Sequence, residues 1–213
     1  HRRPRVRLNV FSGEPFATAV STWLAGFVRG FYDVDLAVER VDRLEQAAFL
    51  PEETDLGVLV SDGLPGRYDD VKRVLDGGLP GFDPIFWKLG LHPCKHVGFG
   101  VFGDVPVLVF PDVFFKTALA ALAFLPRLLA RWVGRRVAAR PASWPEIPEI
   151  HYPTPCLVPL RFGDERRGLR VLATPLRSSF SARHASAAEG WLVLEAPPRV
   201  DDEFDAFVLG RLA

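Results

Sequence analysis

Apolar and polar residues alternate in two short stretches near the N-terminus. In residues 5–10 (RVRLNV) and residues 34–39 (VDLAVE), every second residue is apolar, and this period predicts β-strands with one buried face. Between them, apolar residues recur at intervals of three and four from Phe16 to Phe31. This spacing predicts a helix whose apolar stripe packs against the sheet that the strands form.

The middle of the chain continues the alternation of strand and helix. Residues 56–60 (LGVLV) form a continuous apolar run, which is typical of a central parallel strand covered on both faces. A helix is expected at residues 67–75, and residues 97–110 predict two short strands. Residues 113–134 predict a long closing helix, which Pro126 should kink.

This order of elements predicts two domains. Alternating strands and helices indicate a three-layer α/β sheet over residues 1–137. The proline-rich stretch from Arg140 to Pro155 marks a boundary, because it cannot continue the helix. Short strand-like runs follow at residues 169–173, 191–196 and 204–212, so we expect residues 138–213 to form a small β domain or barrel.

The same pattern locates a candidate ligand site. Ligands of open α/β sheets bind at the carboxyl ends of the strands. In this chain those ends are expected at residues 12–14, 61–63 and 111–112.

Composition and charge exclude several classes of protein. The chain has 26 Lys and Arg and 26 Asp and Glu, so no overall field attracts nucleic acid or an anionic membrane. The most apolar run, residues 117–126, is shorter than the roughly 20 residues of a membrane span, and no secretory leader opens the sequence. We therefore expect a cytoplasmic protein with neither nucleic-acid nor membrane partners.

Residues 86–100 (FWKLGLHPCKHVGFG) gather side chains that bind anions or metals. Were the segment extended, His92, Cys94 and His96 would share one face, but no carboxylate or second cysteine completes a metal site there. We therefore predict no metal. We also predict no disulfide to Cys156 in a chain of cytosolic character. Lysines in this segment are either anion ligands or solvated surface residues, and the residues alone leave both readings open.

Three segments, in order, resemble the molybdopterin molybdotransferase family, whose relatives include the C-terminal domain of gephyrin. They are LGVLVSDGLPGRYDDVKRVL (residues 56–75), FWKLGLHPCKHVGFG, and VPVLVFPDVFFKTALAAL (residues 105–122). In that family a strand ends in Ser-Gly-Gly, a KPGKP segment follows, and PGNP precedes a long helix. The resemblance covers essentially the whole chain and implies a molybdopterin-binding-type α/β sheet with a small C-terminal β domain. Family members are longer, because two N-terminal domains dimerise and complete the active site.

The family resemblance implies an activity and a set of site residues. Members insert molybdate into adenylylated molybdopterin with Mg²⁺ and release AMP, so molybdopterin or its adenylylated form is the implied ligand. Asp69 matches the Asp after Ser-Gly-Gly and Lys88 matches the Lys of FWK, which implies catalytic roles for both. The positions implied to bind ligand are Glu14, Ser61, Gly63, His92, Lys95, Pro111, Ser178 and Ser179.

Several positions depart from the family pattern. His92 replaces a Lys, Asp62 replaces a Gly, and Asp112 with Val113 stands where PGNP has Gly and Asn. A carboxylate about 4 Å from a phosphate costs on the order of 4 kcal/mol at an effective dielectric near 20. A neutral His also removes one fixed positive charge. These changes predict loss of affinity for the pyrophosphate-bearing ligand, although the two Asp residues are also ordinary turn and N-cap residues.

Three functions follow from these observations. The first is a diverged relative of the molybdotransferases, without transferase activity, that binds a partner or an altered ligand. The second is an active enzyme of molybdenum cofactor assembly whose N-terminal domains come from another chain. The third is a non-catalytic interaction module. A homodimer and a protein partner are both left open.

Overall fold

The computed structural model describes most of the chain. The described residues are 2–11, 15–41, 46, 49, 52–61, 80–87, 89–111, 114–132, 138–146, 153–167, 170–175, 187–199 and 202–208. They form two compact units, one of His1–Leu89 with Lys95–Ala118, and one of Gly90–Cys94 with Leu119–Ala213. This division falls within a helix, whereas the sequence places a boundary near residue 137, which stays a prediction.

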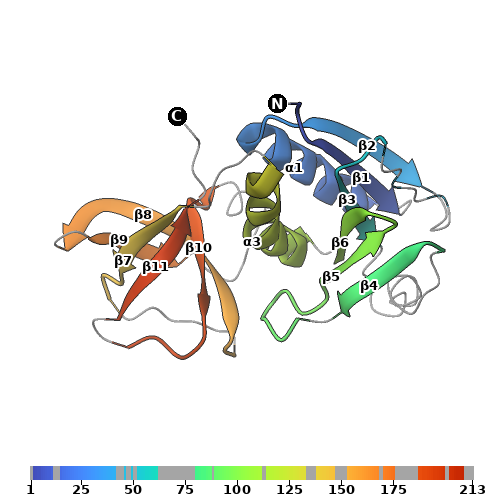
Figure 1. The fold of residues 1–213 in the computed structure, drawn as a ribbon. Helices are drawn as coiled ribbons and strands as arrows, with labels where there is room; N and C mark the ends of the chain where they lie inside the picture. Colours follow the sequence, from blue (N-terminus) through green and yellow to red (C-terminus); the bar gives the residue numbers. More distant parts are fainter. Residues whose placement is uncertain are drawn as a thin grey trace. The chain divides into compact units, whose positions relative to one another are not determined.

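The first unit is built on a six-stranded sheet in the order β2-β1-β3-β6-β5-β4 (Figure 1). Strands β1, β2, β3 and β6 run parallel, and β5 and β4 continue the sheet by antiparallel pairing. The strands are β1 (Arg5–Phe11), β2 (Asp35–Val41), β3 (Leu56–Ser61), β4 (Phe82–Trp87), β5 (Gly98–Phe102) and β6 (Val105–Pro111). The predicted α/β class is confirmed, as are the strands expected near residues 5, 34, 56 and 97–110.

Helix α1 (Pro15–Phe31) covers one face of β1, β2 and β3. Val20, Leu24 and Val28 are buried on the helix, and Val6, Leu8 and Val10 are buried on β1. Each such side chain contributes about 1.5–3 kcal/mol when it is fully buried. The helix therefore forms because its apolar stripe has a sheet face to cover, as the spacing of three and four predicts.

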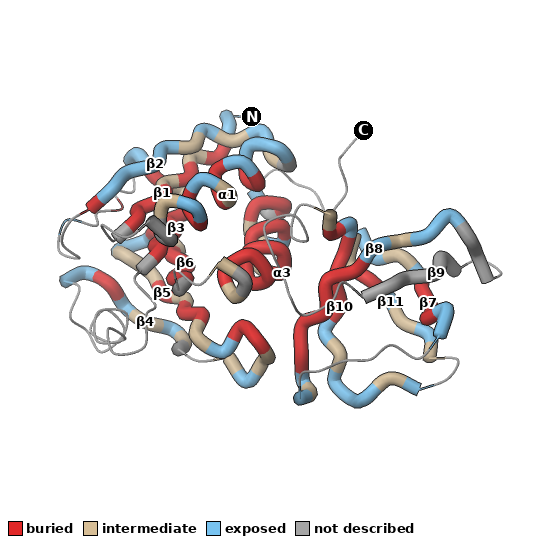
Figure 2. The backbone as a smooth tube through the Cα atoms, turned by 180° about the vertical axis from the view of Figure 1, so that it is seen from behind, coloured by how far each residue is buried: buried red, intermediate tan, exposed pale blue. Residues whose placement is uncertain are grey.

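The opposite face of the sheet carries a second apolar cluster. Its buried members are Val41, Phe49, Leu59, Phe82, Val105, Val107 and Val109, and Phe102 packs against them. Strand β3 is buried along its length, as expected of a strand between two parallel neighbours, and Figure 2 shows it among the buried strands of the sheet.

Charged side chains tie the starts of β1 and β3 together. The Asp55 carboxylate accepts hydrogen bonds from the Arg5 backbone N–H at 2.8 Å and from Arg5 Nη2 at 3.1 Å. Arg2 Nη2 lies 2.7 Å from Asp55 Oδ1. Burial raises the pKa of the Asp55 carboxyl, but the hydrogen bonds from Arg5 and the charges of Arg5 and Arg2 outweigh burial and hold the pKa below its ordinary value.

Helix α3 (Phe114–Trp132) contains Pro126, as expected, and contributes residues to both units. In the second unit, its Arg127 guanidinium lies 4.9 Å from the centre of the Trp191 ring and 4.5 Å from that of Phe207. The two rings stack on each other at 4.5 Å. This contact holds the second half of α3 against two strands of that unit.

Five strands of the second unit form a closed sheet in the order β10-β11-β7-β9-β8. They are β7 (Ala139–Ser143), β8 (Cys156–Arg167), β9 (Arg170–Pro175), β10 (Gly190–Leu194) and β11 (Glu203–Val208). Trp144 and Phe204 meet in its apolar interior, with ring centres 4.4 Å apart. The predicted small β domain is therefore present, and β7 lies inside the proline-rich stretch that the sequence marks as a boundary. In the described ranges, neither helix has the length and hydropathy of a membrane span.

Candidate functional site

Three parallel strands of the first unit end side by side. Phe11, the last residue of β1, is the register partner of Ser61, the last residue of β3. Ser61 is in turn the partner of Pro111, the last residue of β6. The segments that follow these strands therefore leave the sheet from adjacent points of one edge, which we call the carboxyl edge.

Two helices begin close to the carboxyl edge. Helix α1 begins at Pro15, which suits a first helical position because its missing N–H needs no partner there. Helix α3 begins at Phe114, three residues after the end of β6. Neither helix has an acidic residue in its first turn, so the partial positive charge of each N-terminus is not offset from within the helix.

The structure describes four of the ten site residues that the sequence suggests. Ser61 and Pro111 lie at the carboxyl edge, and His92 and Lys95 lie in the segment between β4 and β5. The others are outside the described residues, as are Asp62, Asp112 and Val113: Glu14, Gly63, Asp69, Lys88, Ser178 and Ser179. The ligand-binding and catalytic roles suggested for all ten stay predictions.

His92 and Lys95 belong to different compact units. The His92 N–H donates to the Pro155 carbonyl at 3.0 Å, and its carbonyl accepts from the Leu157 N–H at 2.7 Å, so His92 extends the start of β8. The Lys95 carbonyl accepts from the Leu89 N–H at 3.1 Å within the first unit, and its side chain is exposed. The two residues are thus not placed as a set by one rigid sheet edge.

The segment around Cys94 is not extended throughout, because the chain turns at Lys95 and His96. Among the described residues, which include His92, Cys94 and His96, no group of three His, Cys, Asp or Glu side chains could hold a metal. No disulfide joins Cys94 to Cys156, and both are fully buried. Burial raises the pKa of the Cys156 thiol, which makes it a poor nucleophile.

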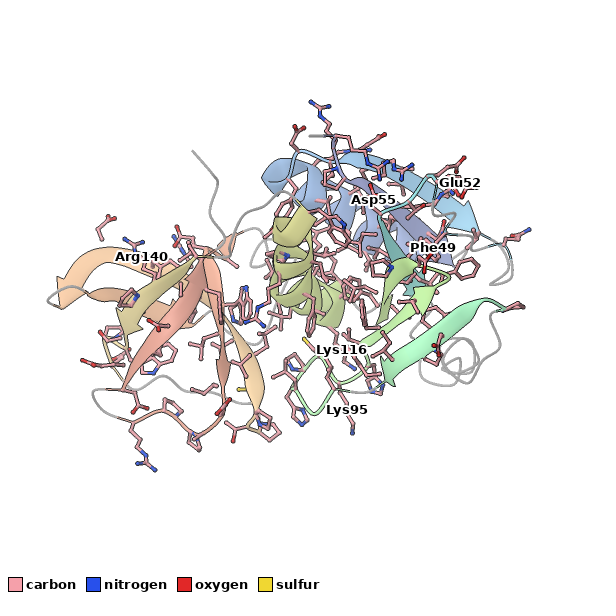
Figure 3. The ribbon with its side chains drawn as sticks, viewed as in Figure 1. Phe49, Glu52, Asp55, Lys95, Lys116 and Arg140 are labelled. Atoms are coloured by element: carbon pink, nitrogen blue, oxygen red, sulfur yellow. The ribbon has the colours of Figure 1, made fainter. Side chains whose placement is uncertain are left out.

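Two polar residues near the carboxyl edge were not singled out by the sequence pattern. Lys116 lies in the first turn of α3, where it is half-buried, and Figure 3 labels it together with Lys95. A cation in the first turn opposes the helix dipole, and this was the available signal. Asn9 is fully buried on β1, two residues before the strand ends. Its polarity was hidden in a strand pattern whose alternation assigns it to the solvent side.

Comparisons with known proteins give the fold a name. No protein-family model matches the sequence, and no curated protein matches it. A crystal structure of the molybdopterin biosynthesis MoeA protein from Pyrococcus horikoshii has a TM-score of 0.63 at 15% identity, covering 98% of this chain and 55% of that one. A second crystal structure of a MoeA protein from this organism has a TM-score of 0.63 at 14% identity, covering 97% and 54%.

A molybdenum cofactor biosynthesis protein from Pyrococcus furiosus is similar to the same degree. Its TM-score is 0.63 at 15% identity, and the match covers 98% of this chain and 69% of that one. This chain spans about half the length of the two Pyrococcus horikoshii chains. The likeness extends over both units, and it confirms the fold that the sequence motifs suggested: the chain has the MoeA-type molybdopterin-binding fold.

Proposed function

We propose that this chain is a diverged relative of the molybdopterin molybdotransferases that has lost molybdate insertion and uses its carboxyl edge to bind a less anionic ligand or a partner. The fold places it among proteins of molybdenum cofactor biosynthesis. Loss of activity and the changed ligand are the parts that we infer. A cytoplasmic location belongs to the same proposal.

The observation that carries the proposal is the alignment of three strand ends. Because Phe11, Ser61 and Pro111 are register partners in adjacent strands, the segments that follow them start from one short stretch of sheet edge. Two of these segments begin with an acid, Asp62 directly after Ser61 and Asp112 directly after Pro111. Glu14 follows β1 three residues after Phe11. Three carboxylates therefore arise close to the place where the family resemblance puts a pyrophosphate.

Electrostatics then argues against a strongly anionic ligand. Each carboxylate within about 4 Å of a phosphate opposes binding by on the order of 4 kcal/mol at an effective dielectric near 20. Of the two basic ligand positions that the structure describes, Lys95 is exposed and His92 is incorporated through its backbone into the second unit. The donor set does not fit a dianionic group, and it suits a neutral or cationic group better.

The test is an AMP-release assay with the purified chain, adenylylated molybdopterin, molybdate and Mg²⁺. A molybdotransferase of known activity serves as the positive control. We expect no AMP above the level without protein, and calorimetry should detect no binding of the adenylylated pterin. AMP release at a catalytic rate would overturn the proposal in favour of an active transferase.

The same titrations separate a ligand-binding protein from a pure interaction module. Molybdopterin and a neutral pterin without phosphate should be compared in one series. Binding of the neutral pterin alone would agree with the altered ligand that we propose. Absence of binding by every pterin would instead favour a fold kept only for contact with another protein.

A further inference from the structure

Strand β2 is a long exposed edge of the sheet in the first unit. It stands at the end of the strand order, where the described strands give it one partner, β1. Along its seven residues only Val41 is buried and only Leu36 is half-buried. Val38, an apolar residue at the centre of the strand, is 42% exposed. Figure 2 shows this exposure along most of β2.

The backbone groups of β2 alternate between β1 and the open side. The Asp35 N–H donates to the Pro4 carbonyl at 2.9 Å, so Asp35 faces β1 with its backbone. In a parallel ladder the residues that face one neighbour alternate with those that face away from it. The N–H and C=O groups of Leu36, Val38 and Arg40 therefore point to the open edge. Arg29 Nη2 approaches the Leu36 carbonyl only at 3.5 Å.

The other edge of the sheet, β4, is protected against pairing with another chain. Pro84 lies within β4 and cannot donate a hydrogen bond, and the register shifts between Pro84 and Phe86. Proline and irregular register are two common devices that block an edge strand. Strand β2 has neither of them. The contrast indicates that the two edges are not equivalent.

We propose that β2 pairs in antiparallel orientation with β2 of a second copy of this chain, around a two-fold axis at Val38. The two sheets would then form one continuous sheet of twelve strands, given the six of each copy. Such a two-fold contact brings the same strand of both copies together, so one self-complementary sequence is sufficient. This inference does not depend on the ligand of the carboxyl edge.

Charge complementarity selects the register. Outward-facing residues must lie opposite outward-facing residues, so neighbouring registers differ by a shift of two residues. With the axis at Val38, Ala37 lies opposite Glu39 of the second copy, and no two like charges are directly opposite. All seven residues of β2 pair in this register.

The two neighbouring registers are less favourable. A shift in one direction puts Asp35 opposite Glu39, and a shift in the other puts Glu39 opposite Glu39. Like charges directly opposite each other in an antiparallel pair are destabilising. Both shifts also shorten the paired segment. The register centred on Val38 is therefore the one that the sequence of β2 favours.

Sedimentation velocity of the full chain over a wide range of micromolar concentrations tests the proposal. We expect a monomer that converts to a dimer as the concentration rises. Val38→Lys places two lysines opposite each other at the axis and should abolish the dimer. Val193→Lys is the matched control, because Val193 on β10 is a similarly exposed valine at 38%, and this variant should dimerise normally. Circular dichroism checks that both variants are folded.

A second pair of variants tests the register without relying on Val38. Ala37→Lys should tighten the dimer and Ala37→Glu should weaken it, because residue 37 faces Glu39 of the second copy twice in each dimer. Cross-strand pairs of this kind change the dissociation constant by on the order of tenfold when two act together. A chain that stays monomeric throughout, or a dimer that responds equally to Val38→Lys and Val193→Lys, would overturn the proposal.

Discussion

Gly57, on the central strand β3, lies where no side chain fits. A Cβ added to it would lie 2.6 Å from Cδ1 of Phe49 and 2.9 Å from Cγ2 of Val107. Phe49 and Val107 are themselves buried. The glycine therefore lets the Phe49 ring pack directly on the strand. In the sequence Gly57 is one residue of an apolar run, and nothing near it predicts a ring that arrives from eight residues upstream.

Replacing Gly57 should therefore destabilise the first unit. We expect Gly57→Ala to lower the free energy of unfolding by about 1–3 kcal/mol, the usual cost of overpacking a tight core. Gly26→Ala is the matched control, because Gly26 is exposed on α1 and an added Cβ there meets nothing within 4 Å. The control should gain about 0.5–1 kcal/mol from helix propensity. Urea denaturation followed by circular dichroism measures both, and equal changes would contradict this account of Gly57.

Asp55 makes stability depend on pH at the acidic end. Its pKa is lower in the folded protein than the ordinary value of 3.8, so its ionised form favours folding. That contribution is fully present above the ordinary value and is lost as the pH falls through the lower, folded-state pKa. The interaction joins residues fifty positions apart, which is why the sequence pattern did not reveal it.

Asp55→Asn should lower stability at neutral pH by about 1–3 kcal/mol, as for other hydrogen bonds to charged groups. The variant should also lose less stability than the natural protein when the pH falls from the ordinary carboxyl range. Asp33→Asn is the control, because the Asp33–Arg3 pair is largely exposed and such pairs contribute little. Thermal unfolding across acidic pH measures the slopes, and parallel curves for Asp55→Asn and the natural protein would refute the role of Asp55.

At the scale of elements, the alternating strands and helices of the first unit follow from the sequence, but β7 does not. Proline normally argues against an internal strand, and β7 contains Pro141. The structure accommodates it because β7 pairs with β9 only from Ala142 onward, so the missing N–H of Pro141 does not interrupt that pairing. Pro141 is opposite Asp205 of β11. Such tolerance depends on which residues a neighbouring strand reaches, which composition does not reveal.

The attachment of α3 to β10 and β11 is also beyond sequence patterns. Arg127 follows Pro126 in an apolar helix, where it would be expected only to face solvent. Its guanidinium instead covers the stacked rings of Trp191 and Phe207. A guanidinium over aromatic faces stabilises by about 0.5–2 kcal/mol, depending on how far it is desolvated.

Arg127→Ala should therefore lower the stability of the second unit by about 1 kcal/mol, the middle of the range for cation–π contacts. It should also change the fluorescence of Trp191, which loses its cationic neighbour. Arg161→Ala on β8 removes an exposed arginine from the same unit and is the control. If the two variants unfold at the same temperature and keep the same emission, Arg127 does not anchor the helix.

At the scale of the whole molecule, the sequence motifs led to the correct fold, because the order of strands, loops and helices is long enough to be specific. The site was less predictable. Ser61 and Pro111 do lie next to each other, since strand order and register bring them together. The alternation of His92, Cys94 and His96 did not produce a common face, because a turn interrupts it. His92 also joins β8 through its backbone, a partnership that depends on residues more than sixty positions away.

The account rests on the carboxylates that follow β3 and β6, and calorimetry with adenylylated molybdopterin tests it most directly. The natural chain is compared with Asp62→Gly, His92→Lys and Asp112→Gly combined, which restores the family residues. Asp104→Gly with Asp164→Gly is the control: it removes two acids elsewhere, Asp104 at the opposite end of β6 and Asp164 on β8. We predict that only the restored variant binds measurably. Equal binding by all three proteins, or tight binding by the natural chain, would contradict the account.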